Sequence, residues 1–412
     1  MATVLVLGAG MVGTCTALHL ALRGHTVTLV DRRGPGQETS YGNAGIIQRE
    51  AVEPHPFPRE ACSLAKMALG QDNAVHYSLG ALPAMASALF GYWANSSPRR
   101  YAAIARAYAR LIEHSTSEHE PLIERAQAQG LVFRDGYRFV YREAASYRKE
   151  VARARRLAQS YGLQHVELDS DALAAAEPAL RRRLAGSIHW LDAWSVRDPG
   201  ALVERYAALF QEVGGTLLQG DAATLAPAGA GWRVRCVDQT IDAEHAVVAL
   251  GPWTDALLRP MGYRYPLFIK RGYHRHYQSS QPPALPMMDA DNSLVIVPMF
   301  KGVRITTGAE FARLDAPPTP VQLEYSRRLA GELINLGEPV EPQPWLGARP
   351  CTADMLPIMG QAPRHKGLWF NFGHAHQGFT LGPACGRLLA DMIEGKTPYL
   401  ESGPYLPTRF GA

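Results

Sequence analysis

The chain contains 412 residues, of which 47% are hydrophobic and 19% charged, and its formal net charge is +4. These values describe an ordinary globular protein that is long enough for two domains or one large elaborated domain. A net charge this small gives no support for a nucleic-acid-binding function.

The cysteines and the apolar runs indicate a cytoplasmic protein. The five cysteines lack C-x-x-C or zinc-ligand spacing, so we expect small buried side chains in a reducing compartment. No basic segment precedes an N-terminal apolar run, and no stretch of about 18 apolar residues could span a bilayer. We interpret the arginine clusters at 99–100, 153–156 and 181–183 as solvated helix faces. Peripheral contact with the inner membrane is the alternative.

A dinucleotide-binding pattern opens the chain. The apolar run Val4–Leu7 predicts a strand buried on both faces, and three glycines in the spacing G-x-G-x-x-G follow it. An amphipathic helix is then expected to end at Gly24, before a second apolar strand at Thr26–Val30. The second strand ends in Asp31. A tight strand–helix turn without a ligand is the alternative interpretation.

Each residue of this motif has a physical role. Gly8 allows the turn, Gly10 lets the backbone approach a pyrophosphate, and Gly13 lets the helix pack closely on the strand. The helix N-terminus offers free N–H groups and a partial positive charge to the phosphates. The Asp31 carboxylate can accept hydrogen bonds from ribose hydroxyl groups.

The next segments predict a loop, then helices, then a hairpin. Residues 32–48 are rich in Gly, Ser, Thr and Asn, and we expect an ordered loop that reaches back over the cofactor. Residues 60–128 carry apolar side chains at helical spacing. Short strands at 131–134 and 137–141 flank an Asp-Gly pair, which predicts a β-hairpin.

The remaining segments return to the first domain and add a second sheet. Asp198 and Pro199 predict the start of a helix that runs to Val213. Residues 266–308 predict a strand-rich second sheet, and residues 345–357 predict a loop. Further strands are expected at 186–190, 216–219, 232–237, 243–250 and 368–372, and further helices at 146–159, 169–176, 319–336 and 381–393.

These elements predict an α/β fold in which a Rossmann-type domain is interrupted by a substrate domain of mixed sheet and helices. We expect residues 1–50, 198–256 and 350–412 to form the cofactor domain. Residues 51–197 and 257–349 are expected to form the substrate domain.

The C-terminal stretch NFGHAHQGFTLGPACGRLLADMI repeats the order strand, glycine, helix. Its helix is expected to begin near Phe379 and Thr380 and to present free N–H groups. Such a terminus can stabilise negative charge on a reduced isoalloxazine ring, which fits a flavin better than a nicotinamide. A buried structural helix without a ligand is the alternative.

Arg349 is the strongest candidate for substrate binding. It lies in WLGARP, an otherwise apolar stretch bounded by proline, and therefore needs an anionic partner. A substrate carboxylate held by both arms of the guanidinium would provide one. A buried salt bridge to Asp or Glu is the alternative.

A polar alternation marks the predicted strand around Tyr273. Tyr273, Arg275 and Tyr277 are expected on one face, and His274 and His276 on the other. The sequence does not decide which face lines a pocket. We expect no metal site, because the H-x-H pairs His274/His276 and His374/His376 lack a third ligand. No Ser/His/Asp, paired-carboxylate or reactive-cysteine arrangement stands out, so we expect a cofactor to perform the chemistry.

Together these stretches resemble the D-amino-acid oxidase/glycine oxidase superfamily of FAD enzymes, and most closely the bacterial D-amino-acid dehydrogenases. The resemblance covers nearly the whole chain. It is carried by VLGAGMVG with Asp31, ETSYGNAG at 38–45, IKRGY at 269–273, GARPCTADMLPIMG at 347–360 and the C-terminal stretch at 371–393. Those dehydrogenases usually read K-G-Y without the additional Arg271 and lack the paired His374/His376, so we expect a specialised pocket.

The resemblance implies a set of site residues. FAD would bind non-covalently at Gly8, Ala9, Gly10, Val12, Gly13, Asp31, Arg32, Ser40, Asn43, Ala44, Gly45, Ala222, Gly251, Trp253, His374, Gln377, Gly378, Phe379 and Thr380. The substrate would contact Arg349, which would hold its carboxylate, and Tyr273, His274 and His376. No side chain is assigned as a catalytic acid or base.

The resemblance also implies the reaction. The Cα–H hydride of a D-amino acid or related secondary amino acid would pass to flavin N5, as in amino-acid catabolism, and a quinone or oxygen would accept the electrons. A cyclic substrate such as D-proline or D-hydroxyproline is one hypothesis. The alternatives are an oxygen-reducing amino-acid, sarcosine or glycine oxidase and a flavin subunit of a multi-subunit dehydrogenase. An NAD(P)-dependent dehydrogenase is disfavoured by the C-terminal turn.

Overall fold

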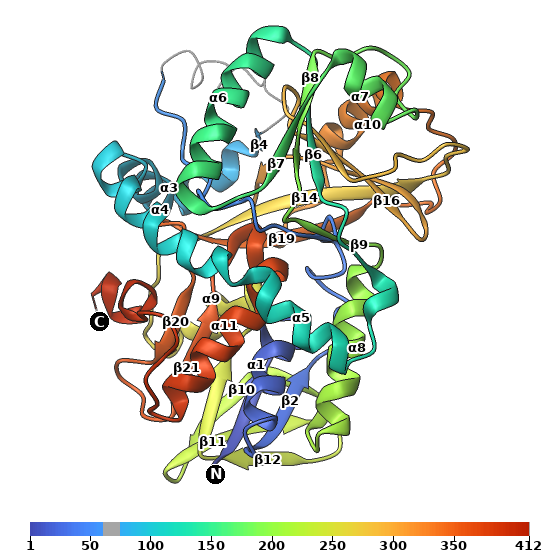
Figure 1. Ribbon diagram of the computed structural model, residues 1–412. Helices are drawn as coiled ribbons and strands as arrows, with labels where there is room; N and C mark the ends of the chain where they lie inside the picture. The colour runs from blue at the N-terminus through green and yellow to red at the C-terminus, as the bar shows by residue number, and fades with distance from the viewer. Residues whose placement is uncertain (61–74, 412) are drawn as a thin grey trace.

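The computed structural model describes residues 1–60 and 75–411 and contains two large β-sheets, one in the lower and one in the upper half of Figure 1. The strands of the first sheet are β1 (Thr3–Leu7), β2 (Thr26–Asp31), β10 (Thr216–Ala228), β11 (Gly231–Cys236), β12 (Thr240–Ala243), β13 (His245–Val248), β20 (Ile358–Gln361) and β21 (Leu368–Phe372). Their order is β12-β11-β10-β2-β1-β13-β21-β20. The central pairs, from β10 to β21, are parallel, which confirms the predicted α/β class.

The first sheet carries the predicted βαβ unit. Helices α1 (Met11–Ala21), α8 (Pro199–Glu212) and α11 (Gly378–Ile393) pack together on it, in the lower centre of Figure 1. The amphipathic character that we predicted for the first helix is wrong. Nearly every residue of α1 is buried, because α8 and α11 cover the sides that the sheet leaves open.

The second sheet has the order β4-β18-β14-β17-β16-β15-β6-β8-β7, and β19 also pairs with β14. Its strands are β4 (Val75–Tyr77), β6 (Tyr137–Tyr141), β7 (His165–Asp169), β8 (Gly186–Trp190), β14 (Leu267–Tyr277), β15 (Met287–Asp289), β16 (Leu294–Met299), β17 (Gly302–Thr306), β18 (Ala309–Phe311) and β19 (Trp345–Thr352). A small third sheet contains β3 (Ile46–Ile47), β5 (Val132–Phe133) and β9 (Trp194–Val196).

Most of the remaining helices lie around the second sheet and the junction between the two sheets, whereas α9 contacts β10 of the first sheet (Figure 1). They are α3 (Leu82–Asn95), α4 (Pro98–Glu113), α5 (Ser115–Arg125), α6 (Ala144–Tyr161), α7 (Ser170–Ala176), α9 (Thr254–Leu258) and α10 (Val321–Leu333). Part of the helical segment predicted from residue 60 onward lies outside the described residues. The predicted helix starts at residues 169 and 198 are confirmed, and both are capped: Asp169 accepts from two N–H groups of α7, and Asp198 accepts from Ala201 N–H in α8.

Two predicted elements differ from the structure. The hairpin is wrong, because β5 pairs with β9 in the small sheet whereas β6 pairs with β8 in the large one. The predicted loop at 345–357 is wrong over its first half, because Trp345–Thr352 forms β19 against β14. Pairing with a distant strand overrides the local preference of a segment rich in Gly and Pro.

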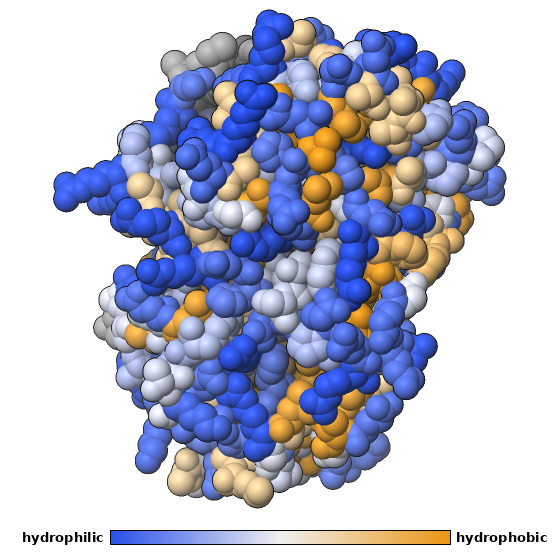
Figure 2. All heavy atoms as spheres, viewed as in Figure 1, coloured by the Kyte–Doolittle hydropathy of each residue, from blue (hydrophilic) through white to orange (hydrophobic). Residues whose placement is uncertain are grey.

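The surface and the cysteines add little to the functional picture. The face in Figure 2 is mostly hydrophilic, with its apolar side chains in separate groups. Within the described ranges, no helix combines the length and apolar character needed to cross a membrane. Cys15, Cys236, Cys351 and Cys385 are buried and free, whereas Cys62 lies outside the described residues.

Candidate active site

A cavity of about 740 Å³ lies between the two large sheets. One end of its wall is formed by residues that end or follow strands of the first sheet, namely Gly8, Asp31, Leu250 and Gly373. Strands β14 and β19 of the second sheet form the other end. The carboxyl ends of parallel strands are the usual ligand-binding edge of a doubly wound sheet.

The first helix N-terminus opens into this cavity. Helix α1 begins without a side-chain cap, and Gly10 and Val12 line the cavity. The Met11 N–H donates to Ser40 Oγ at 2.9 Å, which ties the following loop to the helix. A Cβ on Gly13 would come within 1.8 Å of the Gly8 carbonyl oxygen, so the turn requires glycine at position 13. The remaining first-turn N–H groups are available for an anion.

Asp31 lies beside this helix terminus. Its Oδ2 accepts from Ala9 N–H at 2.7 Å and its Oδ1 accepts from Arg33 N–H at 2.8 Å. Burial raises the pKa of this carboxyl group, while the two backbone N–H groups oppose that shift. Since each carboxylate oxygen has a further lone pair, Asp31 can still accept from the hydroxyl groups of a ribose.

Arg32 and Trp253 form the outer part of the same end. The Arg32 guanidinium lies 4.2 Å from the centre of the Trp253 ring and donates to Glu38 Oε1 at 2.6 Å. Ala222 and Gly251 line the cavity beside them. This combination of an acid, a stacked aromatic ring and small residues suits an adenosine group.

The second helix N-terminus lies further along the cavity. Helix α11 begins at Gly378 without a side-chain cap, and Gly378 and Phe379 line the wall with His374 and His376. Burial lowers the pKa of His374 to about 3, so its imidazole is neutral. Its Nε2 atom is buried and has no protein partner within the described residues. A neutral ring nitrogen and a helix terminus are therefore available to a polar group bound here.

Arg349 projects from β19 into the cavity wall. Its Nη1 donates to the Gly308 carbonyl oxygen at 3.3 Å, and within the described ranges it makes no ion pair. Desolvation lowers the pKa of its guanidinium group. The alternative of an internal salt bridge is therefore not observed in the described part of the chain, and the guanidinium is available to a carboxylate ligand.

Several residues that no sequence pattern singled out share this end of the cavity. Lys270 Nζ donates to Tyr92 Oη at 3.3 Å and lies over the rings of Tyr92, Phe268 and Phe311. His55 contributes a ring 5.1 Å from that of His376. Lys270 reaches the cavity through the pairing of β14 with β19, a segment that the sequence predicted as a loop. No sequence signal indicated Tyr92 or His55.

The ring of His376 is uncharged. Desolvation lowers the pKa of His376 well below its ordinary value. The positive charges of Lys270 and Arg349 act in the same direction. Lys270 and Arg349 therefore supply the positive charge of this end.

Some predicted cofactor residues lie one layer behind the cavity wall. In the glycine turn, Ala9 N–H donates to Asp31 and Gly13 packs on Gly8. In the loop that follows, Gly45 N–H donates to Asn43 Oδ1 at 2.8 Å. At the start of α11, Gln377 donates to Gln48 Oε1 at 2.9 Å and Thr380 Oγ1 donates to the Ile46 carbonyl oxygen at 3.3 Å. These residues hold the wall in place. Asn43 and Ala44 line the cavity directly.

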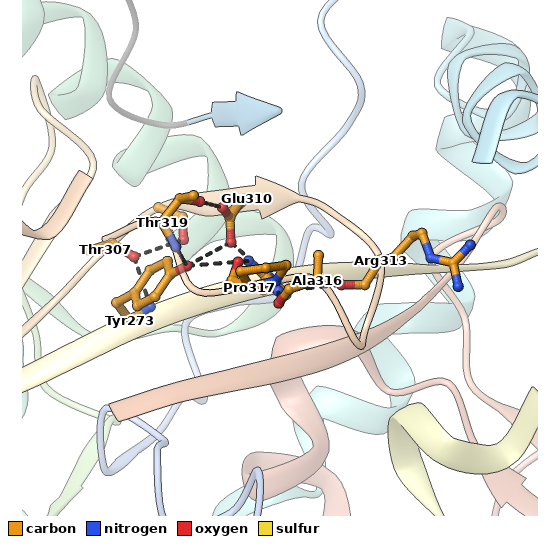
Figure 3. Close-up of polar contacts among 9 residues, drawn as sticks. Tyr273, Thr307, Glu310, Arg313, Ala316, Pro317 and Thr319 are labelled. Carbon is orange, nitrogen blue, oxygen red and sulfur yellow. Dashed lines mark hydrogen bonds and ion pairs between the residues drawn. The ribbon is translucent and has the colours of Figure 1, made fainter. Parts of the chain in front are cut away.

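The predicted substrate residues on β14 differ in their placement. Tyr273 borders the cavity, but its Oη donates to Glu310 at 3.0 Å and accepts from Thr319 N–H at 2.7 Å, in the network of Figure 3. His274 does not reach the cavity wall, because its ring stacks on Trp345 at 4.8 Å. Their roles in substrate binding stay predictions.

Arg304 of β17 clamps the loop that we expected to reach over the cofactor. It donates to the carbonyl oxygens of Tyr41, at 3.0 Å, and Asn43. Its Nε donates to His276 Nε2 at 3.0 Å, and the other ring nitrogen of His276 bonds Glu341 at 2.6 Å. Burial and the charge of Arg304 lower the pKa of His276 to about 4, so the neutral ring accepts from Arg304 and donates to Glu341.

Replacing Arg304 by methionine is expected to weaken FAD binding by about 10- to 100-fold, because two charge-assisted bonds to the loop are lost. The Kd of the apoprotein for FAD, from flavin fluorescence quenching, measures this effect. Arg313→Met removes an exposed arginine paired with Asp315 and serves as the control. Equal FAD affinity of Arg304→Met and wild type would contradict the clamp.

Glu50 lies behind the same loop, and its side chain makes stability depend on pH. It accepts from Gln48 Nε2 at 3.0 Å, and burial raises its pKa from 4.5 to about 7. The folded state therefore favours the protonated form of Glu50. The stability that this group contributes is fully present below pH 4.5 and is lost as the pH rises through about 7. Glu50→Gln should recover up to about 3 kcal/mol at pH 8 and little at pH 4.5.

Urea denaturation of wild type and Glu50→Gln across this pH range measures the difference. The exposed Glu113→Gln is the control and should show no pH-dependent difference from wild type. A constant difference between Glu50→Gln and wild type at every pH would contradict the raised pKa.

The residues of the cavity fit FAD. One cavity is lined by a helix N-terminus with Asp31 and by a second helix N-terminus with His374, whose Nε2 atom has no partner among the described residues. The first set suits the diphosphate and adenosine groups, and the second suits a ring that becomes negatively charged on reduction. Among the described residues near the second terminus, Arg349 and Lys270 are free of acidic partners.

The comparisons with known proteins agree with this fit. The family model DAO, FAD dependent oxidoreductase, matches residues 3–392. A D-amino-acid oxidase of Bradyrhizobium diazoefficiens is 30% identical over 99% of this chain and 98% of its own length. A D-amino acid dehydrogenase of Cereibacter sphaeroides is 30% identical over 97% of this chain and 93% of its own length.

Solved structures show the same fold. Glycine oxidase from Geobacillus kaustophilus superposes with a TM-score of 0.76 at 20% identity, over 99% of both chains. L-proline dehydrogenase from P. horikoshii superposes with a TM-score of 0.74 at 18% identity, over 99% of this chain and 97% of its own. With a family model that spans nearly its whole length, the chain belongs to the DAO family of FAD dependent oxidoreductases.

Proposed function

We propose that this protein dehydrogenates a D-amino acid or a related secondary amino acid and binds FAD non-covalently. The observation that carries the proposal is Arg349, a guanidinium in the cavity wall whose bonding within the described residues includes no acidic side chain. Relatives over the full chain are named D-amino-acid oxidase and D-amino acid dehydrogenase, which supports the same substrate class.

The chain's own residues would position the substrate. Arg349 would hold the α-carboxylate with both arms of its guanidinium, and orientation of this kind supplies a large part of a rate enhancement. The neutral ring of His376 and the aromatic walls would exclude water around the amine. When bound, FAD supplies the acceptor of the α-carbon hydride at its N5 atom. The N-terminus of α11 would stabilise the negative charge that then develops.

Turnover on a panel of D- and L-amino acids, with oxygen or an artificial quinone as acceptor, tests the proposal. We expect D-amino acids to be oxidised, and the quinone to support faster turnover than oxygen. Faster peroxide formation in air would identify an oxidase instead. Absence of turnover with every amino acid would contradict the proposal. Trichloroacetic acid precipitation should release all the flavin, as expected for a non-covalent cofactor.

The panel should include D-proline and D-hydroxyproline, because aromatic side chains such as Phe268 and Phe311 can pack against a ring. A cyclic preference is supported if these substrates exceed D-alanine and D-methionine in kcat/KM. If the electron acceptor is a membrane quinone, the protein would also contact an anionic membrane surface peripherally. Sedimentation with anionic lipid vesicles, reversed by salt, tests that contact.

A further inference from the structure

The positively charged side chains on the two faces of β14 differ in whether they have an acidic partner. Arg271 lies on the face away from Arg349 and is fully paired: it donates to Glu310 at 2.7 Å and to the Pro317 carbonyl oxygen at 2.9 Å. Only 1% of Arg271 is exposed. Figure 3 shows the partners of this network, in which Tyr273 and Thr319 also contact Glu310. Arg271 therefore has its counter-ion within the protein, on Glu310.

The opposite face presents two cations to the cavity. Lys270 of β14 and Arg349 of β19 are direct partners in the antiparallel register, and both line the cavity. Directly opposed residues of such a pair have Cβ atoms about 5 Å apart, and like charges in these positions are destabilising. Arg349 also extends over Gly272, where an added Cβ would lie 2.5 Å from its Nη2 atom.

No acidic side chain offsets this pair within residues 1–60 and 75–411. The acidic residues of the cavity wall are Asp31, Glu38 and Asp221, all at the end formed by the first sheet. Asp31 accepts from backbone N–H groups, and Glu38 is paired with Arg32. The titratable neighbour His376 has a pKa well below its ordinary value and is neutral.

The ammonium group of Lys270 is held in place but not saturated. It has three N–H donors, and its hydrogen bond to a described residue is the one to Tyr92 at 3.3 Å. Three aromatic rings lie within 4.6 to 5.7 Å of Nζ and fix its position. A positioned cation with spare donors, beside a second cation, is a site for an anionic ligand.

We infer that the substrate carries two carboxylates: Arg349 binds the α-carboxylate, and Lys270 binds a second carboxylate on the side chain or ring. The inference rests on the proposed function and narrows its substrate class to dicarboxylic amino or imino acids. A neutral amino acid would leave one of the two cations without a counter-ion.

Kinetics of the holoenzyme on D-aspartate, D-glutamate, D-alanine and D-methionine test this inference. Wild type should have the higher kcat/KM on the two dicarboxylic substrates. Lys270→Met should lower that value by about 10- to 100-fold on D-glutamate while changing it less than about 3-fold on D-alanine. Lys270→Arg, which keeps the charge, should retain most of the activity on D-glutamate.

Lys301→Met is the matched control. Lys301 also donates to a tyrosine hydroxyl, that of Tyr41 at 3.1 Å, and lies 5.2 Å from its ring, but it is outside the cavity wall. Its replacement should leave the substrate preference unchanged. Binding of glutarate and butyrate, followed by calorimetry, gives a readout without turnover: glutarate should bind more tightly to wild type, and Lys270→Met should abolish the difference.

Preference for neutral D-amino acids together with equal binding of glutarate and butyrate would overturn the inference and leave the proposed function standing. An equal loss on all four substrates in Lys270→Met would also overturn it, because Lys270 would then serve a step common to every substrate. Failure of every amino acid to reduce the bound FAD would overturn the proposed function and this inference with it.

Discussion

Replacing Arg349 by alanine is expected to lower kcat/KM by about 10²- to 10³-fold, mainly through KM, while FAD remains bound. The guanidinium lies in the cavity wall with one hydrogen bond to a described residue, the 3.3 Å bond to the Gly308 carbonyl oxygen. Loss of one member of a buried charge pair costs about 2–5 kcal/mol. Steady-state kinetics on the best D-amino acid, with the flavin content measured in parallel, provides the test.

Two further variants separate charge from geometry. Arg349→Lys keeps a positive charge but loses the planar fork, so its activity should lie between those of wild type and Arg349→Ala. Arg275→Ala removes an arginine of β14 that donates to the carbonyl oxygens of Glu341 and Pro342, and it should leave KM unchanged. Unaltered kinetics of Arg349→Ala would exclude Arg349 from the substrate site.

Replacing Asp31 by alanine is expected to weaken FAD binding by about 100-fold or more. The carboxylate accepts from the N–H groups of Ala9 and Arg33, at 2.7 and 2.8 Å, so it shapes the glycine turn in addition to offering acceptors to a ribose. Loss of the carboxylate leaves two backbone donors without a partner and removes the acceptors that we expect to bind a ribose, and each loss weakens the site. Flavin retained after extensive dialysis and the Kd of the apoprotein for FAD measure the effect.

Asp242→Ala is the control for this prediction. Asp242 belongs to the same sheet, in β12, but its carboxylate is exposed and paired with Arg233 at 2.6 Å. Its replacement should leave FAD binding unchanged. Full flavination of Asp31→Ala after dialysis would show that the ribose contact contributes little.

The sequence was sufficient for the parts of the fold that depend on local pattern. The βαβ unit around Gly8 and Asp31 and the caps at Asp169 and Asp198 follow from short-range chemistry, and the structure confirms them. The segment around Arg349 was predicted as a loop because Gly347 and Pro350 disfavour a strand locally. Its pairing with β14 depends on a distant partner, which the sequence pattern does not encode.

The same reason explains what was missed in the site. Residues at strand ends, such as Asp31 and Gly251, could be placed by the rule that parallel strands end at a common edge. Lys270 could not, because its orientation depends on the register between β14 and β19. The additional Arg271, which we expected to signal a specialised pocket, instead forms a buried pair with Glu310 on the other face.

Anaerobic mixing of the purified holoenzyme with single D-amino acids, followed through the visible absorption band of the flavin, tests the central claim most directly. We predict that at least one D-amino acid bleaches the band within the catalytic time, and that Arg349→Ala, with the same flavin content, needs a far higher concentration for the same rate. A flavin that stays oxidised with every D-amino acid, or an Arg349→Ala variant that is reduced as readily as wild type, would contradict it.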